Sequence, residues 1–176
     1  MATQRLFLAL FPSHTIQRRL AEAGRALQAH VGGRCVATPL LHLTLAFLGD
    51  TSDDIVPALC DRLAAVSCAS FDLTLDQVGV WPQAGIGWMQ PTQPPAALWQ
   101  LHRSIQQQLQ ALGLPVEQRA FKPHITLLRK APPSRGPLPP CPAIDWPVTT
   151  FQLIASTLTT NGPQYRPLAS WPLASA

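Results

Sequence analysis

The chain has 176 residues, of which 47% are apolar and 12% are charged, and its formal net charge is +4. This length suits one domain, and a disordered chain is excluded because disorder pairs low hydrophobicity with high charge. No apolar run approaches the roughly 20 residues that span a membrane, and the N-terminal apolar run stops at Pro12 without a signal-peptide pattern. We therefore expect a cytoplasmic protein with no membrane partner.

Hydrophobic periodicity predicts alternating strands and helices in the first half of the chain. A strand over residues 5–11 ends at Pro12. Ser13 is the expected N-cap of the next helix, which ends at Gly32. The elements that follow are a strand at 40–48, a helix that starts at Thr51 or Ser52, a strand at 71–76 that extends to Trp81, and its hairpin partner at 86–89.

The second half is predicted to hold one helix and three strands. Apolar residues at helical spacing mark a helix over 95–112, which ends at Gly113. Residues 131–147 hold 7 of the 19 prolines, so we expect this proline-rich loop to contain no regular element. The predicted strands lie at 122–128, 149–159 and 165–171.

A shift of 82 residues aligns the two halves of the chain. It places His42-Leu-Thr-Leu45 on His124-Ile-Thr-Leu127 and the first helix on the second, and a further slip of two places 71–73 on 151–153. Two similar halves, each ending in antiparallel strands, indicate an α+β fold. We expect one domain over residues 1–176, with two pseudo-symmetric lobes, each an antiparallel sheet with helices on its outer face, around a central cleft.

The two His-x-Thr segments are the candidate site. A single match is weak evidence in a chain with five histidines, but two matches one repeat length apart, each in a predicted strand, are much stronger. Residues i and i+2 of a strand share a face, so His42 points with Thr44 and His124 points with Thr126. Pseudo-twofold packing of the halves would bring both faces into one cleft.

The chemistry of this cleft follows from its groups. Imidazole has an unperturbed pKa near 6.5 and acts as acid or base at neutral pH. Two imidazoles on opposite sides of a phosphorus atom would let one accept a proton from the nucleophile while the other protonates the leaving oxygen. The threonine hydroxyls would donate hydrogen bonds to the non-bridging oxygens. Such a site needs no cofactor.

The segments from His42 to Gly49 and from Phe121 to Arg129 resemble the paired motifs of the two-histidine phosphoesterases, and more closely those of the RNA 2′,3′-cyclic phosphodiesterase (2′-5′ RNA ligase, LigT/ThpR) family. The resemblance implies metal-independent hydrolysis of an RNA 2′,3′-cyclic phosphate to a 2′-phosphomonoester. It implies that His42 is the proton donor and His124 the proton acceptor, and that Thr44 and Thr126 bind phosphate oxygens. RNA with a cyclic end is the implied partner, and we expect a monomer.

The same resemblance assigns Arg129 to substrate binding. A cation suits a phosphate site, and residues 77–176 carry seven basic and two acidic side chains. Strict alternation, however, puts Arg129 on the strand face opposite His124 and Thr126. A bulge or strand end between 127 and 129 would be needed to turn it into the cleft.

Other interpretations stay open at this stage. Zinc is disfavoured because no Asp, Glu or Cys lies at ligand spacing near the motifs, and the four cysteines are expected to be buried free thiols. An RNA ligase would use the same groups, with an alcohol in place of water, and a non-catalytic RNA-binding module is a third hypothesis. Core packing is the expected role of most aromatic residues, and the candidates for stacking on a base include Phe47, Phe121 and, above all, Tyr165.

Overall fold

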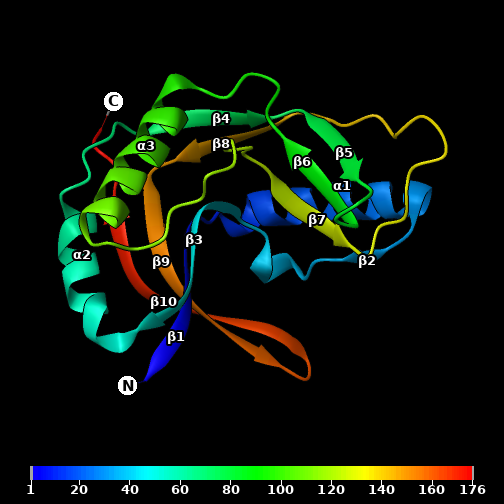
Figure 1. Ribbon diagram of the computed structural model, residues 1–176. Helices are drawn as coiled ribbons and strands as arrows, with labels where there is room; N and C mark the ends of the chain where they lie inside the picture. The colour runs from blue at the N-terminus through cyan, green and yellow to red at the C-terminus, as the bar shows by residue number, and fades with distance from the viewer. Residues whose placement is uncertain (1, 176) are drawn as a thin grey trace.

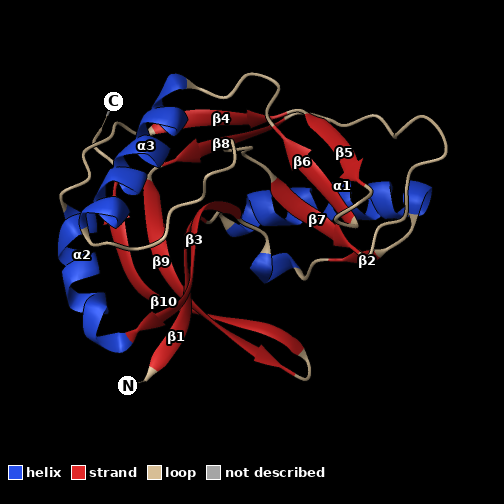
Figure 2. Ribbon diagram, viewed as in Figure 1, coloured by secondary structure: helices blue, strands red, loops and turns tan. Residues whose placement is uncertain are grey.

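The computed structural model describes residues 2–175 and contains one long antiparallel sheet with three main helices (Figures 1 and 2). The sheet has eight strands, seven of them in the order β10-β9-β1-β3-β7-β6-β5, and β2 pairs with β7 beside this path. We call one end the terminal lobe, formed by β1 (Thr3–Leu10), β3 (Leu43–Ser52), β9 (Thr150–Thr159) and β10 (Gly162–Pro172). The other end is the central lobe, formed by β2 (Arg34–Cys35), β5 (Gln77–Trp81), β6 (Ile86–Gln90) and β7 (Ile125–Arg129). The expected α+β fold with two lobes is confirmed.

The lobes meet at a single pair of strands. In the β3–β7 pairing Leu43 lies opposite Ile125, and both side chains are fully buried. These residues directly follow His42 and His124, so the two motifs adjoin at the junction of the lobes. The predicted strands over 40–48 and 122–128 begin only at Leu43 and Ile125, and each histidine precedes its strand.

The lobes do not coincide with the two halves of the sequence. Helix α1 (His14–Val31), which connects β1 to β2, contacts β7 in the central lobe. Helix α3 (Ala96–Ala111), which connects β6 to β7, contacts β3 and packs with α2 (Val56–Ala64) on the terminal lobe (Figure 1). An 18-residue helix is about 27 Å long, which is enough to carry the chain from one lobe across to the other.

Local signals explain the ends of α1. The Ser13 hydroxyl accepts a hydrogen bond from the backbone N–H of Ile16, as expected of an N-cap. Gly32 ends the helix with a positive φ of 81°, a conformation that favours glycine. Two short 3₁₀ turns, Thr38–Leu40 and Asp53–Ile55, precede β3 and α2.

Two sequence expectations about β4 (Phe71–Leu75) and β8 (Ile144–Val148) were wrong. The proline-rich loop 131–147 was expected to hold no regular element, yet its last four residues belong to β8, which pairs with β4 in a separate two-stranded sheet. Pro147 is tolerated because β8 pairs on one side only, where a missing N–H costs little. The second wrong expectation is the alignment of residues 71–73 with 151–153, which lie in β9. The counterpart of β4 in the other half is β8. The counterpart of β9, which lies beside β1, is β5, which lies beside β6.

No helix within residues 2–175 is long and apolar enough to cross a membrane.

Candidate active site

His42 and His124 are held by the same backbone contact. The Nδ1–H of His42 donates to the carbonyl oxygen of Leu40 at 2.6 Å, and the Nδ1–H of His124 donates to the carbonyl oxygen of Lys122 at 2.7 Å. A carbonyl only accepts, so the proton of each neutral ring is on Nδ1 and Nε2 is left for the site. The Nε2 atom of His42 lies 3.0 Å from Oγ1 of Thr44, whose hydroxyl can donate to it.

One cavity of about 460 Å³ contains both motifs. Both histidines and both threonines line it, in the groove between the lobes. A volume in this range accommodates a ligand of nucleotide size. The residues that line it include no carboxylate and no thiol; the remaining ones are Arg5, Phe7, Arg34, Val36, Leu40, Phe47, Arg129, Ser156, Leu158, Pro163 and Tyr165.

Aromatic rings enclose His42. Its ring centroid lies 5.1 Å from those of Phe7 and Phe11 and 5.5 Å from that of Tyr165. The pKa of His42 is lowered to about 4, chiefly by burial among these rings; the hydrogen bond to Leu40 opposes this effect, and the charges of Arg129 and of a protonated His124 add to it. The imidazole of His42 is therefore neutral at pH 7 in the free protein.

His124 has a different aromatic neighbour. Its ring meets Trp81 edge to face with 4.6 Å between centroids. Burial is the largest cause that lowers the pKa of His124, and Arg129 adds to it. The two histidines therefore share the hydrogen bond at Nδ1 and differ in their surroundings, with His42 the more strongly held in the neutral form.

A bulge turns Arg129 into the cavity. In the β6–β7 pairing, Trp88 lies opposite Thr126 and the next residue, Gly87, lies opposite Leu128, so Leu127 has no partner on β6. Leu127 and Leu128 are both buried and Arg129 is exposed at the cavity, because the extra residue reverses the alternation.

An equivalent bulge interrupts β3. Leu8 lies opposite Ala46 and Ala9 lies opposite Thr44, so Leu45 has no partner. The residue two positions further on, Phe47, lies at the cavity with 53% of its surface exposed. The guanidinium of Arg5 lies 4.9 Å from the centre of the Phe47 ring. Phe47 is thus not a core residue, and it is one of the aromatic residues that the sequence offered as candidates for stacking on a base.

The sequence reasoning missed Arg5 and Arg34. Both come from the first half of the chain, so the excess of positive charge in residues 77–176 did not indicate them. Alternation along the first predicted strand could have found Arg5, because it puts Arg5 and Phe7 on one face. No pattern near Arg34 indicated that a two-residue strand would carry it to the cavity.

Other candidates of the sequence lie elsewhere or act differently. Tyr165 packs against His42 and Phe7. Phe121 stacks on His102 at 4.0 Å, away from the cavity. Of the four free cysteines only Cys68 is buried, and within residues 2–175 no three His, Cys, Asp or Glu side chains gather as metal ligands would.

The comparison with protein families decides the family. Two successive segments of the chain, residues 10–88 and 89–165, each match the model described as LigT like Phosphoesterase. The chain belongs to the LigT-like phosphoesterases. The two matched segments contain one His-x-Thr motif each, in agreement with the internal repeat.

Similar proteins share nearly the whole length of this LigT-like chain. An RNA 2′,3′-cyclic phosphodiesterase of Escherichia coli is 37% identical over 172 residues, which cover 97% of each chain. One of Thermus thermophilus is 34% identical and covers 96% of this chain and 90% of its own. The crystal structure of Escherichia coli LigT complexed with 3′-AMP superposes with a TM-score of 0.87 at 35% identity, covering 98% of this chain and 99% of its own.

Proposed function

We propose that this LigT-like protein is an enzyme that hydrolyses 2′,3′-cyclic phosphate ends of RNA to 2′-phosphomonoesters. The observation that carries the proposal is the pair of His-x-Thr motifs with their Nε2 and hydroxyl groups on one cavity. Relatives named RNA 2′,3′-cyclic phosphodiesterase, at 37% and 34% identity over almost the whole chain, support the same reaction.

In the proposed mechanism, water attacks the phosphorus atom while His124 accepts its proton. The P–O3′ bond breaks, and His42 donates a proton to O3′, which leaves the phosphate on O2′. Thr44 and Thr126 donate hydrogen bonds to the non-bridging oxygens, where negative charge grows in the transition state. The Arg129 guanidinium offsets that charge.

The assignment of donor and acceptor rests on the family resemblance. For His42 to be the donor, its pKa must rise when substrate binds, because its surroundings in the protein keep it neutral. An anionic phosphate beside the imidazole has this effect, since an opposite charge favours the protonated form. The reverse assignment, with His42 as the base, has one observation in its favour: the low pKa of His42 in the free protein.

A ligase that joins a 2′,3′-cyclic end to a 5′-hydroxyl is the second candidate function, because the same groups would activate an alcohol in place of water. The two are separated by one experiment on a cyclic-ended oligoribonucleotide with and without a 5′-hydroxyl acceptor strand. We expect the shortened 2′-phosphate product to form much faster than the joined strand. Faster joining than hydrolysis at equal substrate would make the protein a ligase.

A further inference from the structure

Two arginines lie directly opposite each other on neighbouring strands of the cavity wall. In the short β2–β7 pairing Arg34 is the register partner of Arg129, and both side chains line the cavity. Like charges directly opposite on a sheet repel each other. Neither guanidinium is within ion-pair distance of a carboxylate in the described part of the chain.

This pairing depends on a close backbone approach at Gly33. A Cβ atom on Gly33 would lie 3.0 Å from the backbone carbonyl oxygen of Arg129 and 3.0 Å from Cα of Ala131, and the residue has a positive φ of 90°. Only glycine fits both conditions without strain. Gly33, which directly precedes Arg34, is therefore required for the close approach of the two backbones that places Arg34 opposite Arg129.

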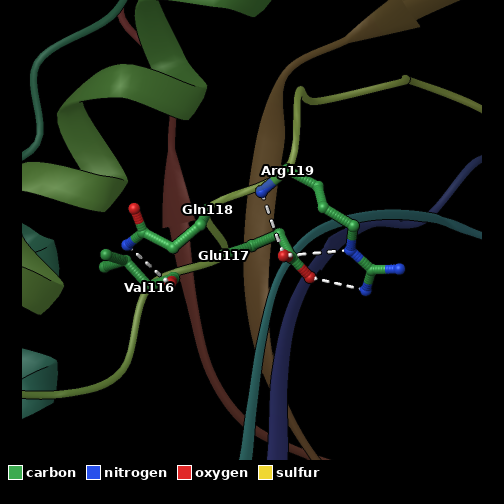
Figure 3. A network of polar contacts seen from close by, with 4 residues as sticks. All are labelled: Val116, Glu117, Gln118 and Arg119. Carbon is green, nitrogen blue, oxygen red and sulfur yellow. Dashed lines mark hydrogen bonds and ion pairs between the residues drawn. The ribbon is translucent and has the colours of Figure 1, made fainter.

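One arginine outside the cavity has a carboxylate partner. Arg119, in the connection between α3 and β7, is neutralised by Glu117 through contacts of 2.8 and 3.1 Å (Figure 3). The cavity arginines have no such partner, and no Asp or Glu is among the cavity residues. An arrangement that gathers unpaired guanidinium groups in one cavity is suited to an anion with more charge than a single phosphodiester.

The two arginines also differ in their effect on the histidines and in their place relative to the motifs. Arg129 contributes to the lowered pKa of both His42 and His124, whereas Arg34 is not among the charges that perturb either one. Arg129 follows Thr126 on β7, whereas Arg34 lies on β2, a strand that carries neither motif, so we place Arg34 beyond Arg129 on the cavity wall.

We propose that Arg34 binds a second phosphate of the substrate, the one on the 5′-oxygen of the nucleotide that carries the cyclic end. This inference rests on the proposed function, and it names the substrate class as nucleotides with a 5′-phosphate or an upstream phosphodiester. In an RNA strand that phosphate is one sugar away from the cyclic phosphate. Arg129 then binds the cyclic phosphate, and Arg34 beside it binds the 5′-phosphate.

The test compares two substrates that differ only in this phosphate: a nucleoside 2′,3′-cyclic phosphate and its 5′-phosphorylated form. We expect the intact protein to have the higher kcat/KM on the 5′-phosphorylated form. Arg34→Gln should reduce that preference roughly tenfold or more, as expected for a lost charge-assisted hydrogen bond. Arg34→Lys, which keeps a positive charge, should retain part of the preference.

Arg103→Gln is the matched control, because Arg103 is exposed on α3, does not line the cavity, and involves the same loss of charge. It should leave both rates unchanged. A purely structural role for Arg34 would lower the melting temperature of Arg34→Gln. The proposal predicts no such loss, because the substitution also removes the repulsion with Arg129.

Binding of a nucleoside 2′-monophosphate and a nucleoside 2′,5′-bisphosphate, measured by calorimetry, separates this inference from the proposed function. If neither cyclic compound is hydrolysed but the preference for the bisphosphate is lost in Arg34→Gln, the proposed function is wrong and the second phosphate site stands. If the intact protein shows no preference for the 5′-phosphate, or if Arg34→Gln weakens both members of each pair equally, the inference is overturned.

Discussion

Phe47 and Arg129 are 82 residues apart and occupy equivalent places on the two lobes. Each is the second residue after a bulge, Leu45 in β3 and Leu127 in β7, and each lies at the cavity on the side of its own motif. The equivalent backbone positions are thus occupied by an aromatic ring, Phe47, on one lobe and by a cation, Arg129, on the other. This difference gives the two sides of a nearly symmetric site distinct chemistry.

The bulge in β7 leads to a prediction about Gly87. A Cβ atom there would lie 2.9 Å from Cδ1 of Leu128, the residue that follows the bulge. Gly87→Ala should therefore destabilise the fold by about 1–3 kcal/mol, as overpacking does, and lower kcat/KM by displacing Arg129. Denaturant unfolding and steady-state kinetics measure both effects. Gly136→Ala is the control, because nothing lies within 4 Å of the added atom, and equal behaviour of the two variants would contradict the account.

The donor role of His42 can be tested with the leaving group. A diester that releases 4-nitrophenolate needs no protonation of its leaving oxygen, so loss of the general acid matters less. On a 2′,3′-cyclic phosphate, His42→Ala and His124→Ala should each lose roughly 10²–10⁴-fold in rate. On the nitrophenyl diester, His42→Ala should recover much of its rate and His124→Ala should not. Recovery by His124→Ala alone would reverse the assignment.

Arg129 should set the position of the pH–rate profile. Burial and Arg129 keep the pKa values of both histidines below the ordinary 6.5, so kcat/KM, which reports the free enzyme, should decline above about pH 6.5. Arg129→Gln removes a positive charge that disfavours the imidazolium forms, so both pKa values rise and the profile shifts to higher pH. Arg103→Gln should cause no shift. A profile that stays in place or moves to lower pH in Arg129→Gln would contradict the electrostatic account.

His42 should also make the fold sensitive to acid. Its pKa is about 4 in the folded protein and near 6.5 in the unfolded chain, so the unfolded state binds the proton more readily. The stability is then fully present above pH 6.5 and is lost as the pH falls toward 4, by about 3 kcal/mol. Urea unfolding between pH 7 and 4 measures how much the free energy of unfolding falls with pH. This decrease should be smaller in His42→Gln than in the control His14→Gln, whose side chain is exposed. An equal loss in both would rule out His42 as the cause.

The sequence predicted those parts of the molecule that depend on short-range patterns. The cap at Ser13, the helix end at Gly32 and the alternation within each motif are local, and they are found as expected. The exchange of helices between lobes, and the pairing of β4 with β8, depend on which strands meet in space, and a pattern with a period of two or 3.6 residues carries no such information. The sequence required a bulge near Arg129 but gave no register from which to locate it. Arg34 is at the cavity only because a two-residue strand pairs with the end of β7.

The central claim is metal-independent hydrolysis of a 2′,3′-cyclic phosphate by His42 and His124. Its most direct test is the product formed from an oligoribonucleotide with a 2′,3′-cyclic end in the presence of excess EDTA, followed by ³¹P NMR. The account predicts full turnover to the 2′-phosphomonoester, with turnover abolished in the double variant His42→Ala/His124→Ala. A 3′-phosphate product, a requirement for added metal, or no reaction would contradict it.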